Sequence, residues 1–176
     1  YSVDDRWLIP HFEKMLYDNA LLARTYLEAF QVTSEKRYAQ TGREILDYVI
    51  REMQSPEGGY YSSTDADSEG EEGRYFVWSQ EEILSVLGKD TGTIVCEYYD
   101  VQPGGNFEHS GKSVLSVPRD PVEVPRQLSL DPEQLETLIR EAKTTLRQAR
   151  EKRVPPALDD KILTDWNGLM ISAMAF

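Results

Sequence analysis

The segment from Pro10 to Phe30, PHFEKMLYDNALLARTYLEAF, has the apolar periodicity of one long helix. Met15, Leu22 and Tyr26 recur at helical spacing. Further apolar residues widen this stripe: Leu16, Ala20, Ala23, Leu27 and Phe30. The apolar surface is wider than a helix at the protein surface needs. We therefore expect a helix over residues 11–30 that packs against neighbours on more than one side.

Three chemically different side chains occur at helical spacing near the start of this segment. His11, Lys14 and Asp18 stand at positions i, i+3 and i+7, which share one face of a helix. One interpretation is a solvated helix end with an ion pair inside the helix. The other is that an imidazole, an ammonium and a carboxylate form part of an acid–base site.

Composition limits the classes of function. The chain has 176 residues, 40% hydrophobic and 28% charged, which is typical of one globular domain. The net charge of −12 argues against nucleic-acid partners and against an anionic membrane surface. No apolar run approaches the roughly 18 residues of a membrane span. Cys96 is the single cysteine, which rules out an internal disulfide and fits a reducing compartment, so we predict a cytoplasmic location.

Both ends of the sequence have the character of internal segments. Tyr1 is not an initiator methionine, and an apolar helical stripe around Trp166 and Met170 runs to Phe176 without a capping residue. We expect the chain to be a piece of a longer protein. Its partner would then be the remainder of its own chain, and part of its apolar surface would lack that partner.

The rest of the chain predicts further helical hairpins. A second helix is expected to follow a joint at 31–34, with Thr33 or Ser34 as N-cap, and to run to about residue 53. Ser79 and Glu82 form a capping-box pattern, Gly88 is a stop signal, and Asp90 is a second N-cap candidate. These signals predict a shorter hairpin over residues 79–98.

Irregular chain over residues 101–125 is expected before the next helix. Asp131 and Pro132 then have the pattern of a helix start. The helix that follows has one apolar stripe: Leu135, Leu138, Ile139, Ala142, Leu146 and Ala149. A last helix is expected around Trp166.

An acidic stretch lies between two segments with β-like composition. Residues 59–63 and 74–78 are aromatic-rich and flank carboxylates from Asp65 to Glu72, so we expect a hairpin with an acidic loop. The start of this loop matches a calcium-binding EF-hand loop, but Phe76 stands where a bidentate glutamate is required. We predict no metal site, with looser calcium binding as a weaker alternative.

Several stretches together resemble one protein family. They are DRW (5–7), PHFEKMLYDNA (10–20), GGYY (58–61), DADS (65–68), GRYFVW (73–78), GNFE (105–108) and Lys161 with WNGLM (166–170). These residues resemble the YyaL-like family of thioredoxin-domain-containing proteins, which includes spermatogenesis-associated members in animals. The resemblance spans the whole chain, and the second and last motifs are the most specific.

The resemblance implies an all-α fold, namely part of an (α/α)6 toroid of six helical hairpins with a short β-hairpin excursion. All matching motifs belong to the toroid, so residues 1–176 are expected to be a fragment of that single domain. The thioredoxin-like domain of the family, with its CxxC motif, is not in this chain. The toroid is similar to N-acylglucosamine 2-epimerases and to six-hairpin glycosidases, and this likeness at the level of the fold suggests carbohydrate chemistry.

The candidate acid–base groups come from the first helix and the acidic loop: His11, Lys14, Asp18, Asp65 and Asp67. Glycoside hydrolysis needs two carboxylates about 5 to 9.5 Å apart, whereas epimerisation needs a base on each face of a carbon. Both chemistries remain open. His109, the second histidine, lies in an irregular loop, and we interpret it as incidental.

The candidate substrate-binding residues are aromatic or polar. Tyr17, Trp78 and Trp166 would stack on sugar rings, although aromatics at these spacings also suit a core. Asn106, Glu108 and Asn167 would contact a ligand or satisfy buried backbone groups.

Two functions follow as hypotheses. The first is a carbohydrate-active or carbohydrate-binding toroid for a small sugar, with no cofactor and with an epimerase-like or glycosidase-like site. The alternative is a non-catalytic helical scaffold that supports a thioredoxin-like redox domain.

Overall fold

The computed structural model describes residues 1–108, 110–119 and 123–176. They divide into two compact units, which are described separately. The hairpin unit comprises Phe12–Asp67 with Pro156–Phe176, and the α6 unit comprises Tyr1–His11 with Ser68–Pro155.

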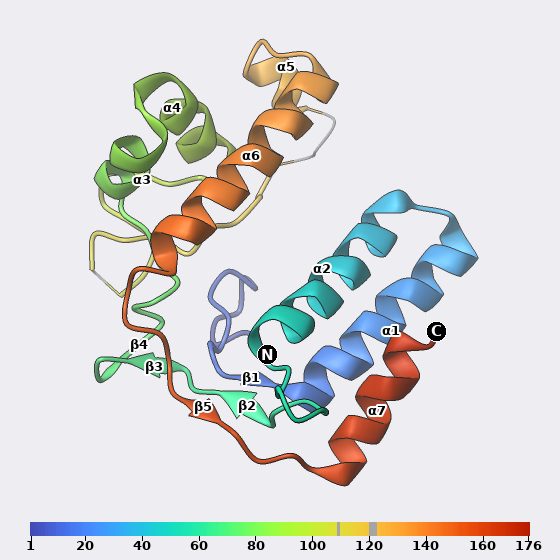
Figure 1. The fold of residues 1–176 in the computed structure, drawn as a ribbon. Coiled ribbons are helices and arrows are strands. Elements are labelled where there is room, and N and C mark those ends of the chain that lie inside the picture. Colours follow the sequence, from blue (N-terminus) through green and yellow to red (C-terminus); the bar gives the residue numbers. More distant parts are fainter. Residues whose placement is uncertain (109, 120–122) are drawn as a thin grey trace. The chain divides into compact units, whose positions relative to one another are not determined.

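Three helices build the hairpin unit. α1 (Leu16–Thr33) packs against both α2 (Lys36–Glu52) and α7 (Thr164–Met174) (Figure 1). The core that these helices share consists of Leu16, Ala20, Val49, Met53, Met170 and Ala173. Short alanine side chains on α1 let the neighbouring helices approach closely. The predicted hairpin of two long helices, and the packing of the first helix on more than one side, are confirmed.

The start of α1 differs from the sequence prediction. The helix begins at Leu16, and Lys14–Met15 form a strand, β1. β1 pairs antiparallel with β2 (Ser63–Thr64), which pairs antiparallel with β5 (Leu158–Asp159). The expectation that His11, Lys14 and Asp18 share a helical face is therefore wrong. Strand partners that lie far away in the sequence hold this segment extended, and local periodicity carries no trace of them.

The acidic stretch also differs from the prediction. β3 (Asp67–Ser68) and β4 (Glu71–Glu72) form their own two-stranded sheet. The residues between them, Glu69 and Gly70, both have positive φ (55° and 80°), as a tight two-residue hairpin turn requires. The expected hairpin between residues 59–63 and 74–78 is wrong. Residues 74–78 enter no named strand, and only Trp78 makes an isolated bridge, to Ser113.

N-cap hydrogen bonds mark the start of two helices in the α6 unit. Before α3 (Gln80–Leu87), the Ser79 hydroxyl and the Glu82 carboxylate each accept a backbone N–H of the other residue, so the predicted capping box is confirmed. Before α6 (Pro132–Arg150), Asp131 accepts the N–H of Glu133 and of Gln134, also as predicted.

The shorter hairpin has one deviation. α4 (Lys89–Tyr98) follows α3 directly, and Gly88, with φ of 78°, both ends α3 and begins α4. The expected N-cap at Asp90 is therefore wrong. A single turn, α5 (Val124–Gln127), completes the helices that the structure describes.

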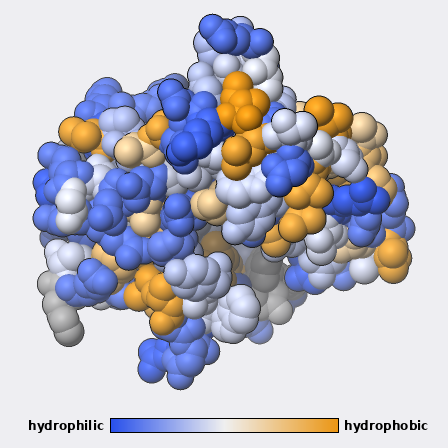
Figure 2. All heavy atoms as spheres, turned by 90° about the horizontal axis from the view of Figure 1, so that it is seen from below, coloured by the Kyte–Doolittle hydropathy of each residue, from blue (hydrophilic) through white to orange (hydrophobic). Residues whose placement is uncertain are grey.

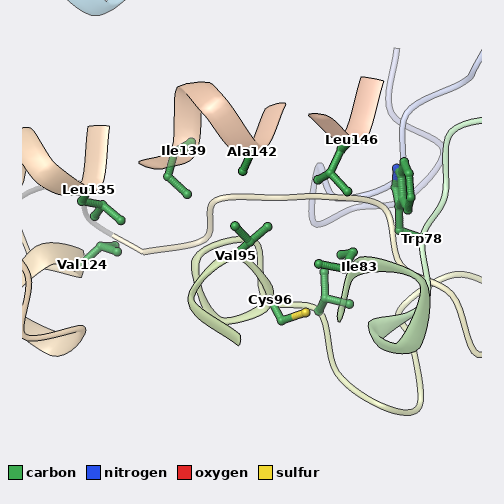
Figure 3. Packing of buried hydrophobic residues seen from close by; sticks show 10 residues of the cluster. Trp78, Ile83, Val95, Cys96, Val124, Leu135, Ile139, Ala142 and Leu146 are labelled. Carbon is green, nitrogen blue, oxygen red and sulfur yellow. The ribbon is translucent and has the colours of Figure 1, made fainter. Parts of the chain in front are cut away.

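The core of the α6 unit lies under the predicted apolar stripe of α6. Figure 3 shows Leu135, Ile139, Ala142 and Leu146 on one side of that helix, facing residues of α3 and α4. Trp78 lies at one end of this cluster and Val124 at the other. Cys96 is buried in the same cluster, and burial raises the pKa of its thiol.

The architecture is mostly helical, as expected, with a few short strands. No α-helix among the described residues combines the length and the apolar character that crossing a bilayer requires. The arrangement of the helices as part of a ring stays a prediction.

Candidate functional site

A groove of about 530 Å³ lies within the α6 unit, beside β4. One wall comes from residues 71–77, and the other comes from Phe107, Glu108, Ser110 and Lys112. Its lining combines three carboxylates, two cations, two apolar residues and a serine: Glu71, Glu72, Glu108, Arg74, Lys112, Val77, Phe107 and Ser110. A concave surface where a few charged groups converge over an apolar floor is the usual form of a small-molecule site.

A tight turn holds the second wall. Gly105 has φ of +67°, and a Cβ there would lie 2.2 Å from the carbonyl oxygen of Lys112, so this position requires glycine. Asn106 accepts the N–H of Val114 at 2.8 Å and donates to its carbonyl at 3.1 Å. Asn106 thus satisfies backbone groups, one of its two predicted roles. The turn places Glu108 and Lys112 on the rim of the groove.

An imidazole and a carboxylate meet at the first wall, which residues 71–77 form. His11 Nδ1 lies 3.0 Å from Oε1 of Glu72, and the ring stacks on Tyr1 with centroids 4.8 Å apart. Because a carboxylate only accepts hydrogen bonds, this contact places a proton on Nδ1 of His11. A histidine oriented in this way by a carboxylate is suited to general base catalysis.

A partly buried ion network begins at Lys112, which lines the groove. Lys112 Nζ donates to Glu82 at 3.0 Å, and the Arg153 guanidinium lies 3.6 Å from the same carboxylate. Arg153 also donates to the carbonyls of Tyr75 and Val77 at 2.9 and 2.8 Å. These contacts hold the backbone of residues 75–77, which belong to the first wall of the groove.

Trp78 lies beneath this network. The Arg153 guanidinium stands 4.1 Å from the centroid of the Trp78 ring, and the side chain is only 4% exposed. In this structure Trp78 is part of the core cluster of the α6 unit. Desolvation lowers the pKa of Arg153, but the side chain remains a cation at neutral pH.

The charge on Glu82 predicts a pH-dependent contribution to stability. Burial alone would raise the pKa of Glu82, but hydrogen bonds from Ser79 and Lys112 and the charge of Arg153 lower it overall. A carboxyl with a lowered pKa stabilises the fold above its ordinary pKa and loses that contribution as the pH falls through the folded value. We expect Glu82→Gln, which retains the capping pattern, to cost about 1–2 kcal/mol at pH 7.

The check is urea denaturation at several pH values. The difference between wild type and Glu82→Gln should be constant between about pH 6 and 8 and should shrink below about pH 4. Glu81→Gln, at the exposed neighbouring position, is the control and should change stability by less than about 0.5 kcal/mol. A difference that persists unchanged at low pH would contradict a role for the charge.

Three predicted acid–base residues lie near one another in the hairpin unit. Lys14 pairs with Thr64, the residue before Asp65, and its Nζ donates to the Phe12 carbonyl at 2.7 Å. The N–H of Asp67 donates to Oδ1 of Asp65 at 3.2 Å. Both aspartates are exposed, as is Asp18 in the first turn of α1.

Two predicted ligand-binding aromatics also meet in the hairpin unit. Tyr17 and Trp166 form an edge-to-face pair with centroids 4.8 Å apart. The neighbouring Asn167 is 8% exposed; it accepts the N–H of Tyr60 at 2.8 Å and donates to its carbonyl at 2.9 Å. Asn167 therefore satisfies buried backbone groups, the second of the two roles that the sequence left open.

His11 belongs to the α6 unit, whereas Lys14, Asp18, Asp65 and Asp67 belong to the hairpin unit. Convergence of these five residues on one cavity stays a prediction. His109 lies outside the described residues. Among the residues that are described, no group of three or more histidine, cysteine or carboxylate side chains is arranged to hold a metal ion.

Of the residues that line the groove, sequence reasoning identified only Glu108 as a candidate. The sequence places Glu71 and Glu72 in an acidic loop without a role, and Arg74 and Lys112 carry no signal of their own. The sequence signal that could have located the groove is the GNFE motif, because it contains Glu108 and Asn106, which shapes the loop.

Comparison with known proteins shows whole-chain similarity to one group of curated proteins. The chain is 37% identical to human spermatogenesis-associated protein 20, 36% to the mouse protein and 35% to the rat protein, in each case over 99% of its own length. It covers 25% of each of these relatives, so it spans about a quarter of their length. No family model matches the chain.

Proposed function

We propose that this chain is the part of a longer protein that binds a small carbohydrate, with acid–base groups in the groove of the α6 unit. The observation that carries the proposal is the contact of His11 with Glu72 at a groove that Glu108 also lines. This arrangement provides an oriented base and a second ionisable group at one concave surface.

The lining suits a polyhydroxylated ligand. Carboxylates accept hydrogen bonds from sugar hydroxyls, and the ammonium of Lys112 and the guanidinium of Arg74 donate to ring and hydroxyl oxygens. The apolar faces of Val77 and Phe107 provide a surface for the carbon skeleton of a sugar.

Two reaction classes are compatible with these groups. In an epimerase-like reaction, the imidazole of His11 removes a proton from carbon and a second group returns one to the opposite face. In a glycosidase-like reaction, Glu72 and Glu108 take the two carboxylate roles. We propose the first, because the imidazole of His11 is oriented by Glu72, a carboxylate that lines the groove.

The proposed function also includes a proposed arrangement of the helices. The helical hairpins would form part of an (α/α)6 toroid, in a protein that also carries a thioredoxin-like domain. The whole-chain similarity to longer spermatogenesis-associated proteins supports membership of a larger protein.

The test is binding of individual monosaccharides and N-acetyl amino sugars to the full-length protein, measured by calorimetry. For any sugar that binds, Glu108→Gln and His11→Ala should each weaken affinity by at least about tenfold, because a charged hydrogen bond to the ligand is worth about 1.5–3 kcal/mol. Glu57→Gln, at an exposed position of the hairpin unit, is the matched control and should leave affinity unchanged. The sugar affinity of an Asp65→Asn variant, measured in the same way, tests whether this residue of the hairpin unit contributes to binding.

A second candidate function rests on exposed apolar side chains. Leu22 on α1 is 51% exposed and Ile171 on α7 is 64% exposed, and Figure 2 shows apolar groups at the surface between hydrophilic ones. Such residues suit a helical scaffold that supports a thioredoxin-like domain. If no sugar binds and Ile171→Glu releases a separately expressed thioredoxin-like domain, the scaffold function replaces the carbohydrate function.

A further inference from the structure

A second groove in the α6 unit lies away from His11 and Glu72. It has a volume of about 790 Å³ and runs between α6 and the end of α3. Its apolar floor consists of Val86, Leu87, Leu138 and Ala142, and its polar residues are Thr91, Asp131, Glu133, Gln134, Thr137, Glu141 and Thr145. None of these residues takes part in the carbohydrate proposal.

The charge of this groove has one sign. Asp131, Glu133 and Glu141 line it, and the described residues of its lining include no lysine or arginine. The basic residues of α6 are not among the lining residues, although the Arg140 guanidinium donates to Oγ1 of the lining residue Thr137 at 3.4 Å. The chain as a whole has a net charge of −12, which adds a long-range attraction for cations.

We propose that this groove docks a basic amphipathic segment of a partner protein. An aliphatic side chain of that segment lies on the floor beside Leu138, and its lysine or arginine residues contact Glu133 and Glu141 at the rim. Charge complementarity selects this occupant, because the same carboxylates repel nucleic-acid phosphates and acidic peptides. The arrangement corresponds to an amphipathic helix lying in an apolar groove, which is a common mode of peptide recognition.

The experiment measures binding of a fluorescein-labelled 18-residue peptide of leucine and lysine with helical amphipathic spacing, by fluorescence anisotropy with the full-length protein. We expect Glu133→Gln/Glu141→Gln to weaken binding about fivefold to tenfold, because two rim charges are lost. Thr137→Arg places a cation in the groove at an exposed position and should weaken binding at least as much. Circular dichroism confirms that each variant is folded.

Two controls separate docking from general attraction to an acidic protein. Glu57→Gln/Glu136→Gln removes the same number of charges at exposed positions outside the groove, and Thr144→Arg adds a cation on α6 outside it. Both should retain affinity within about twofold. Equal weakening by the groove variants and the controls would overturn the proposal. The proposal would also be overturned if a peptide with glutamate in place of lysine bound with the same affinity. The same conclusion would follow if a single-stranded oligonucleotide displaced the labelled peptide from the groove.

Discussion

Asn167→Ala is expected to lower the free energy of unfolding of the chain by about 2–4 kcal/mol, because it leaves buried backbone groups without partners. Asn167 joins α7 to the segment after α2 through both the N–H and the carbonyl of Tyr60, and its amide also donates to Leu163 at 3.0 Å. No other side chain provides these contacts after truncation. Urea denaturation monitored by circular dichroism measures the change.

A matched control is available within the same unit. Asn19 makes one local hydrogen bond, to the carbonyl of Met15 four residues earlier, and is half-buried. Asn19→Ala removes the same group and should cost less than about 1 kcal/mol. Equal losses for the two variants would show that the connection between α7 and Tyr60 contributes little to stability.

The second large effect is expected in the α6 unit. Arg153→Ala removes two hydrogen bonds to backbone carbonyls and an ion pair, and it uncovers the ring of Trp78. We expect a loss of about 2–4 kcal/mol, because Glu82 and the two carbonyls lose a charged donor in a partly buried environment. The measurement is urea denaturation, with near-ultraviolet circular dichroism to report the tryptophan environment.

Arg153→Lys distinguishes charge from geometry. A lysine retains the positive charge but lacks the planar fork that reaches the carbonyls of Tyr75 and Val77 together. We expect it to recover less than half of the stability that Arg153→Ala loses. Lys152→Ala, at the exposed neighbouring position, is the control and should stay within about 0.5 kcal/mol of wild type. Full recovery by lysine would contradict the role of the backbone contacts.

The elements predicted best from the sequence are those whose signals are local. The capping box at Ser79 and Glu82 and the cap at Asp131 both occur as expected, because each is a hydrogen-bond pattern within four residues. The single apolar stripe of α6 likewise identified the side that faces the core. Helical periodicity is also a local property, and it identified α1, α2 and α7 as elements.

The failures occur where distant segments decide the backbone. Lys14 and Met15 have helical periodicity but are extended, because their partners Thr64 and Ser63 lie about fifty residues later. Strand pairs of two residues have almost no compositional signature, so β5 was not expected, and the predicted β-like segment 59–63 overlaps β2 only at Ser63. The sequence predicts a loop for the acidic stretch because its carboxylates are polar, but a tight turn at Glu69 and Gly70 makes it a hairpin.

By itself, the sequence determined which segments are helical, where several helices begin, and that the fold is mostly helical. The roles of individual polar residues were decided only by tertiary structure. Asn106 and Asn167 satisfy backbone groups, and His11 faces Glu72, sixty-one residues away in the chain. The physical reason is range: a cap or a periodic stripe is satisfied within one element, whereas a side chain that joins two segments has its partner chosen by the fold.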